Sequence, residues 1–212
     1  MNEGLGCLNS PDYNLTTPSG EIFFEGPVES RYLSELEMCP QLDNFRQSDK
    51  QKESLMQIAD LPEGMVFIAR FADMIVGYVT FHYPDKYSRW SKHPRILELG
   101  AIETSRNWRK YKIAKNLLLS AFEYKKFEDY IVITIEFCWH WDLKNSKLNI
   151  WSYQKMLTKL FGHTGLKKCY TDDPDVTEHP ANVLMVRFGD NVSREDKTLF
   201  ESMTFQSRIY GL

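Results

Sequence analysis

The chain has 212 residues, of which 42% are hydrophobic and 14% aromatic, and its formal net charge is −3. This length and composition are typical of a single globular domain with a sizeable core. The slightly acidic balance excludes a protein-wide basic field, and no apolar run reaches the ~20 residues that span a bilayer, so we expect neither a nucleic-acid nor a membrane partner.

The cysteines and the N-terminus suggest where the protein works. Cys7, Cys39, Cys138 and Cys169 are scattered, with no CxxC pair. This pattern is typical of reduced thiols and predicts a cytoplasmic location. The polar N-terminus lacks the basic start and apolar run of a signal peptide. We expect residues 1–19 to form a flexible arm and residues 20–212 to form a single domain.

The first half of the chain predicts a strand, two helices and a hairpin. These elements are residues 20–28, 30–38, 45–59, 65–71 and 74–83. Proline follows each helix and ends it. Only Ala72-Asp73 separates the last two strands, so they should form a tight antiparallel hairpin.

The second half predicts alternating strands and helices. Its elements are a strand over 95–103, a helix from about Lys110, a strand over 129–138, a helix over 146–160, strands over 167–171 and 183–188, and a helix ending at Met203. Ser193 and Asp196 resemble a capping box that opens this last helix. Residues 129–138 are almost continuously apolar, which indicates burial on both faces. The order predicts a mixed α/β layer sandwich, of α+β type, in which a hairpin leads into a βαβ unit.

Positive charge gathers where the strand ending at Glu103 gives way to the next helix. The cations are Arg106, Arg109, Lys110, Lys112 and Lys115. Cations at a helix start oppose its dipole by about 0.3–1 kcal/mol each, so the sequence breaks a local rule here. A bound phosphate would compensate, because the first-turn amides of a helix donate to anions. The alternative is a solvated basic turn.

This turn carries a family resemblance. The segment Arg109-Lys110-Tyr111-Lys112-Ile113-Ala114, with a hairpin before it and an apolar helix and a strand after it, resembles the GCN5-related N-acetyltransferase (GNAT) superfamily. The family signature is Arg/Gln-x-x-Gly-x-Gly/Ala; Arg109 and Ala114 match it, and Lys112 replaces a glycine. The resemblance implies a GNAT-like layer sandwich with a mostly antiparallel central sheet and one parallel, splayed strand pair. It also implies acetyl-CoA as co-substrate and no metal.

The segments ELGAIETSRNWRKYKIAKNLL and LMVRFG are similar, more narrowly, to the acetyltransferases of the acetoin utilization operon of Bacillus-type bacteria. Those enzymes acetylate a lysine of AMP-forming acetyl-CoA synthetase and inactivate it. The resemblance therefore implies a protein lysine N-acetyltransferase whose protein substrate is acetyl-CoA synthetase. An acetyltransferase of small amines and a non-catalytic acyl-CoA-binding sensor stay open, because a fold alone does not choose among them.

The resemblance also implies which residues bind the coenzyme. Backbone amides of the turn would hold the pyrophosphate, and the residues are Arg109, Lys110, Tyr111, Lys112, Ile113, Ala114 and Lys115. The pantetheine arm would pair like an added strand along Ala101, Ile102 and Glu103. For Lys112 there are two alternatives: its backbone stays helical and its ammonium reaches phosphate, or the turn binds more weakly.

Amine acetylation calls for a proton acceptor, because a lysine with a pKa of ~10.4 is rarely neutral at pH 7. Predicted central strands contain Glu98, Glu103 and Glu136. We choose Glu103 first, since it lies where the strand meets the basic turn, and Glu98 second, since histone-type members carry a base near it. The two have opposite strand parity, so a bulge at Gly100 would be needed to bring them to one face. The alternative for Glu103 is an ion pair with Arg106 or Arg109.

Tyr153, the acidic loop 172–182 and the pair His140 and Asp142 are three further candidate features. Tyr153 is a candidate for protonating the thiolate, because many family members carry a tyrosine on this helix, although the usual Tyr-x-Lys-x-Gly-Phe pattern is missing; the alternative is a core tyrosine. The acidic loop 172–182 could attract a basic surface around a substrate lysine, or be merely solvated. His140 and Asp142 lack the further ligands that a metal site needs.

Overall fold

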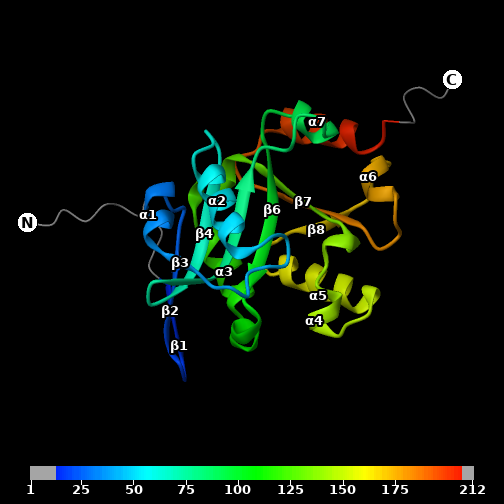
Figure 1. Cartoon of the computed structure of the whole chain (residues 1–212). Helices are drawn as coiled ribbons and strands as arrows, with labels where there is room; N and C mark the ends of the chain where they lie inside the picture. Colours follow the sequence, from blue (N-terminus) through cyan, green and yellow to red (C-terminus); the bar gives the residue numbers. More distant parts are fainter. Residues whose placement is uncertain (1–12, 207–212) are drawn as a thin grey trace, which may run out of the picture. The chain divides into compact units, whose positions relative to one another are not determined.

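The computed structural model describes residues 13–206, and this part of the chain forms two compact units (Figure 1). One unit contains residues 13–82 and 101–124, and the other contains residues 83–100 and 125–206. The fold is mixed α/β, with a mostly antiparallel open sheet and a parallel pair made by β6 (Ile96–Thr104) and β7 (Ile131–Glu136). The predicted fold class is confirmed, whereas the single domain over residues 20–212 stays a prediction.

The first unit contains a meander of antiparallel strands. These are β1 (Tyr13–Thr17), β2 (Gly20–Glu25), β4 (Met65–Phe71) and β5 (Met74–His82). The predicted hairpin of β4 and β5 is confirmed. The short β3 (Glu37–Met38) adds a second parallel pairing, with β5, where a longer helix was expected. The prediction of a flexible arm is wrong for residues 13–17, which form β1; residues 1–12 lie outside the described part.

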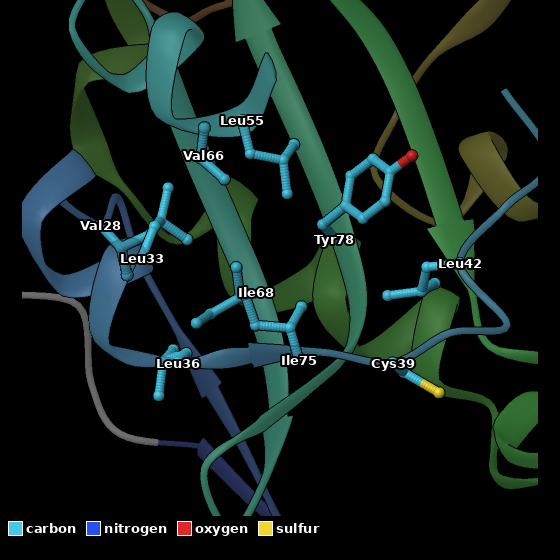
Figure 2. Close-up of a cluster of buried hydrophobic side chains, with 10 residues drawn as sticks. All are labelled: Val28, Leu33, Leu36, Cys39, Leu42, Leu55, Val66, Ile68, Ile75 and Tyr78. Carbon is cyan, nitrogen blue, oxygen red and sulfur yellow. The ribbon is translucent and has the colours of Figure 1, made fainter. Parts of the chain in front are cut away.

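Helices cover both faces of this meander. On one face, α1 (Ser30–Glu35) and α2 (Ser48–Ala59) contribute to a buried cluster with β4 and β5 (Figure 2). The cluster consists of Val28, Leu33, Leu36, Cys39, Leu42, Leu55, Val66, Ile68, Ile75 and Tyr78. On the other face, α3 (Ile113–Phe122) places Phe122 edge-on to Phe81, which packs in the same way on Phe67. Successive strand residues point to opposite faces, so Val66 and Phe67 serve different cores.

The second unit surrounds β7. Its strands β9 (Val183–Phe188) and β8 (Lys167–Cys169) extend the sheet antiparallel from β7. Residues Ile131–Thr134 are buried, as their apolar run predicted. The helices are α4 (Leu143–Ser146), α5 (Ile150–Gly162), α6 (Pro174–Thr177) and α7 (Arg194–Thr204). No helix in residues 13–206 has the length and apolar character needed to cross a bilayer.

Local capping explains where these helices begin. The Ser193 hydroxyl accepts a hydrogen bond from the Asp196 amide at 3.0 Å and donates to the Asp196 carboxylate at 2.8 Å, which confirms Ser193 as the predicted cap of α7. The helix predicted over residues 146–160 is α5, but it begins at Ile150 and ends at Gly162, and the short helix α4 precedes it. Lys147 adopts a left-handed conformation (φ 57°) that ends α4, and the Asn149 side chain then caps α5 by accepting from the Ser152 amide at 2.9 Å.

The parallel pairing of β6 with β7 is short. Strand β6 has nine residues, but it pairs with β7 only from Ile96 to Glu98. Directly beyond the last pair, the Thr134 hydroxyl of β7 donates to the carbonyl oxygen of Leu99 at 3.1 Å. The parallel strand pair that the family resemblance implied is therefore present, and its splay stays a prediction.

Candidate active site

The basic turn after β6 differs from its prediction. Residues Arg106–Tyr111 form a 3-10 turn, Lys112 is left-handed (φ 57°, ψ 29°), and α3 begins at Ile113 rather than near Lys110. Of the two alternatives for Lys112, the one in which its backbone stays helical is therefore wrong. Lysine occupies the conformation that glycine adopts most easily, at a cost of roughly 1–2 kcal/mol.

Tertiary contacts hold this turn in place. The ring of Trp108 packs between Phe71 at the end of β4, 4.9 Å away, and Tyr111, 5.8 Å away, as measured between ring centroids. The Nε of Arg109 donates to the carbonyl oxygen of Thr104 at 3.2 Å. These contacts anchor the middle of the 3-10 turn to the end of β4 and to the end of β6, and Lys112 follows directly and leads the chain into α3.

The left-handed residue opens the start of α3. The amides of Ile113, Ala114 and Lys115 precede the first intrahelical bond, which the Asn116 amide makes with the Lys112 carbonyl at 3.1 Å. Lys112 is the residue before the helix, and its side chain does not cap these amides. The Lys112 amide itself donates to the Arg109 carbonyl at 3.4 Å, so the open donors begin one residue later. Open donors beside exposed cations suit a phosphate.

A glycine in β5 allows this arrangement. A Cβ atom at Gly77 would lie 3.1 Å from the carbonyl oxygen of Glu103 and 3.2 Å from the Cγ2 of Ile113. Both distances are tighter than ordinary contacts, so a side chain at Gly77 would push the end of β6 and the start of α3 away from β5. The sequence contains Gly77 but does not show that the Glu103 carbonyl and the Ile113 side chain pack against it.

Glu103 lies directly before the turn and is 6% exposed. Its Oε1 accepts from the Asn44 amide at 2.9 Å, and its Oε2 accepts from the Tyr78 hydroxyl at 2.8 Å. Burial raises the pKa of Glu103, and these two hydrogen bonds partly oppose that rise. Burial also raises the pKa of Tyr78, with the Glu103 charge as a second cause, so Tyr78 stays a phenol and remains a donor.

The loop before α2 is tied to the same turn. The Gln41 Oε1 accepts from the Ser105 hydroxyl at 3.1 Å and from the Asn107 amide at 3.0 Å. Arg106 forms an ion pair with Asp43. The Asn44 amide adds its bond to Glu103. Sequence reasoning missed this loop, since nothing in residues 41–44 marks a contact with residues more than fifty positions away.

The residues expected to meet the pantetheine arm lie on the second half of β6. Ala101 and Ile102 are half-buried there. The Ala101 amide already donates to the Thr80 hydroxyl at 3.1 Å. This half of β6, Glu103 and the turn belong to the same compact unit.

The second candidate base, Glu98, and the candidate proton donor, Tyr153, lie in the second unit. Glu98 is half-buried at the last paired position of β6. Tyr153 lies on α5, and its ring stacks on Trp141 with centroids 5.3 Å apart and planes 18° from parallel. The structure thus brings Glu103 together with the turn and brings Tyr153 together with Trp141. Trp141 is a neighbour that the sequence did not single out.

The acidic loop is partly neutralised within its own unit. Arg89 is bonded to Asp172 at 2.6 Å and to Asp173 at 3.3 Å, and Asp173 is buried. Those two carboxylates already have a cationic partner, whereas Asp175 and Glu178 are exposed, and attraction of a basic surface by this loop stays a prediction. Within residues 13–206, no cluster of three or more His, Cys, Asp or Glu side chains could hold a metal ion.

Comparison with known proteins agrees with this geometry. Residues 31–142 match the family model described as the acetyltransferase (GNAT) family. The chain is 44% and 42% identical to the acetoin utilization protein AcuA of Bacillus licheniformis and of Bacillus subtilis, respectively, over 92% of this chain and 94% of each relative. The crystal structure of the acetoin utilization protein from Exiguobacterium sibiricum matches with a TM-score of 0.89 and 42% identity, over 97% of this chain and 99% of that one.

Proposed function

This chain belongs to the GNAT acetyltransferase family and is an N-acetyltransferase, and on that premise we propose that it acetylates a lysine of AMP-forming acetyl-CoA synthetase and thereby inactivates it. Relatives at 42–44% identity are named acetoin utilization proteins. The resemblance to the acetyltransferases of the acetoin operon supports a protein acceptor over a small amine. We place the reaction in the cytoplasm, in keeping with the free thiols of Cys39, Cys138 and Cys169.

The open start of α3 is the observation that carries the proposal. The amides of Ile113, Ala114 and Lys115 donate to the pyrophosphate of acetyl-CoA, while Arg109, Lys110 and Lys112 supply positive charge. The pantetheine arm then runs along Ala101, Ile102 and Glu103, which follow the β6 residues Ile96–Glu98 that pair with β7. Tyr111 is the last residue of the 3-10 turn, and its ring packs on Trp108.

With the pantetheine arm along the end of β6, the thioester lies near Glu103, and this position suggests how the acetyl group is transferred. Glu103, with Glu98 as the second candidate, accepts one proton from the substrate ammonium, and the neutral amine attacks the thioester carbonyl. A pKa raised by burial suits Glu103 to this task, because a base works best when its pKa is near the working pH. Tyr153 is the side chain that the resemblance offers for the departing sulfur.

Replacing Arg109 by alanine is expected to raise the Kd for acetyl-CoA about fivefold to tenfold, since one charge-assisted contact with phosphate is lost. Isothermal titration calorimetry measures this effect. Arg31→Ala is the matched control, because Arg31 lies in the same unit and its side chain is 71% exposed. Equal affinity of the Arg109 and Arg31 variants would remove Arg109 from the binding site.

The acceptor is tested by incubating the protein with radiolabelled acetyl-CoA and a bacterial lysate. One labelled band of the size of an acetyl-CoA synthetase is expected, and purified synthetase should lose activity when it becomes labelled. Label in a small molecule would instead favour a small-amine acetyltransferase. Binding of acetyl-CoA without any transfer of label would favour a sensor.

A further inference from the structure

The loop between β3 and α2 carries a polar side chain that the proposed function does not use. Gln41 is half-buried, and it lies between Cys39 and Leu42, which both belong to the buried cluster in Figure 2. The Cys39 amide donates to the Ile75 carbonyl at 3.0 Å, and the Leu42 amide donates to the Cys39 carbonyl at 2.9 Å. The backbone on both sides of Gln41 is therefore anchored within the first unit.

The side-chain oxygen of Gln41 meets the beginning of the basic turn. The first hydrogen bond inside the 3-10 turn Arg106–Tyr111 runs from the Trp108 amide to the Ser105 carbonyl at 2.9 Å. The Asn107 amide precedes that bond, so the turn itself offers it no acceptor. The residue before a helix often supplies this acceptor with its own side chain, but Ser105 does not. Gln41 Oε1 accepts from the Asn107 amide at 3.0 Å instead, so Gln41 caps the turn from a distant part of the chain.

Counting hydrogens assigns the donors and acceptors of this cluster. A backbone N–H can only donate, so the Gln41 atom that faces the Asn107 amide must be the oxygen, which can only accept. The Ser105 hydroxyl therefore gives its one hydrogen to the same oxygen, at 3.1 Å. The Cys39 thiol, whose sulfur lies 3.2 Å from the Ser105 oxygen, is then the donor of that pair. Every hydrogen bond of the cluster ends on Gln41, directly or through Ser105.

The beginning of the turn depends on this oxygen. Ser105 is fully buried, so water does not readily replace the acceptor of its hydroxyl. At its other end the turn leads into Lys112, whose left-handed conformation is costly for any residue with a side chain. Such a conformation persists only where the surroundings support it. Gln41 anchors the beginning of the turn, as the contacts of Trp108 and Arg109 anchor its middle.

We propose that Gln41 is a positioning residue for coenzyme binding, which holds the basic turn so that the first amides of α3 receive the pyrophosphate. This inference rests on the proposed function, which places acetyl-CoA at the start of α3. Gln41 acts through Ser105 and Asn107 and not by touching the coenzyme. Its two hydrogen bonds, the turn and the amides of residues 113–115 all lie in the same compact unit.

Replacing Gln41 by methionine removes the acceptor and keeps a side chain of similar length. We expect the Kd for acetyl-CoA to rise about fivefold to tenfold, because the turn loses its cap. The kcat at saturating acetyl-CoA should stay within about twofold, because the hydrogen bonds to Glu103 come from Asn44 and Tyr78. Calorimetry and steady-state kinetics measure the two quantities. Gln57→Met is the matched control with an unchanged Kd, because Gln57 is exposed on α2 in the same unit.

The conservative variant Gln41→Glu tests whether the accepting oxygen is what matters. A carboxylate accepts from Ser105 and Asn107 as the amide oxygen does. We expect its Kd for acetyl-CoA to stay within about threefold of the wild type, since the added charge repels phosphate and raised salt screens that repulsion.

Amide hydrogen exchange gives a second readout, which needs no ligand. The Asn107 amide should exchange about tenfold faster in Gln41→Met than in the wild type, because its acceptor is gone, and it should stay protected in Gln41→Glu. Equal exchange in Gln41→Met and in the wild type would show that Gln41 does not cap the turn.

Failure of the positioning role can be told apart from failure of the proposed function. A wild type that binds no acetyl-CoA would overturn the proposed function and, with it, the role of the turn. If the wild type binds acetyl-CoA and Gln41→Met binds it equally well, the proposed function stands and Gln41 is not a positioning residue. The same conclusion follows if Gln41→Glu binds as weakly as Gln41→Met at raised salt, or if Gln41→Met only melts at a lower temperature while its Kd is unchanged.

Discussion

Replacing Lys112 by valine is expected to weaken acetyl-CoA binding roughly thirtyfold, which corresponds to about 2 kcal/mol. Lys112 holds a left-handed conformation at φ 57° and ψ 29°, between the 3-10 turn and α3. A branched Cβ is far less compatible with that conformation than an unbranched one. In the valine variant the turn must rearrange, and the amides of Ile113 to Lys115 then no longer converge on one anion.

Glycine at the same position is the matched control. Lys112→Gly keeps the left-handed turn at no steric cost but loses the ammonium, and these effects oppose each other. We expect its Kd for acetyl-CoA to stay within about threefold of the wild type, with a weaker dependence on salt because one charge is lost. Calorimetry at two salt concentrations measures both quantities. Equal affinities of the valine and glycine variants would mean that the conformation of Lys112 does not matter for binding.

Replacing Glu103 by glutamine is expected to lower kcat at least a hundredfold, the usual contribution of a general base, with little change in the Kd for acetyl-CoA. The amide is nearly isosteric with the carboxylate. Its oxygen can still accept from Asn44, and Tyr78 can turn its hydroxyl to accept from the new N–H. The fold should therefore survive, and steady-state kinetics with purified acceptor measures the loss.

The substitution Tyr78→Phe tests whether Glu103 acts through its charge. The Tyr78 hydrogen bond lowers the pKa of Glu103, so its removal should raise that pKa. A base works only when ionised, and the acid limb of the kcat/KM profile should therefore move to higher pH. A normal rate in Glu103→Gln would leave Glu98 as the remaining β6 candidate. An unmoved acid limb in Tyr78→Phe would show that the limb belongs to another group.

The β4–β5 hairpin was predicted correctly, whereas the basic turn was predicted in position but not in conformation. The hairpin of β4 and β5 followed from two apolar runs and a two-residue gap, because strand pairing across a short turn is a local property. The basic turn was located just as firmly by its five cations. Its conformation was not predicted, because the turn is held by Phe71, which contacts Trp108, and by Thr104, which accepts from Arg109, and both lie outside the turn.

Elements with local signals could be predicted from the residues alone: the mixed α/β order, the apolar stripe of α3, the helix cap at Ser193 and the position of the positive charge. The contacts between elements could be found only in the folded chain. Asn44 and Tyr78 bond to Glu103, Arg89 neutralises Asp172 and Asp173, and Thr134 donates to Leu99. A hydrogen bond or ion pair needs atoms within about 3 Å, and residues far apart in sequence reach that distance only through the packing of the whole unit.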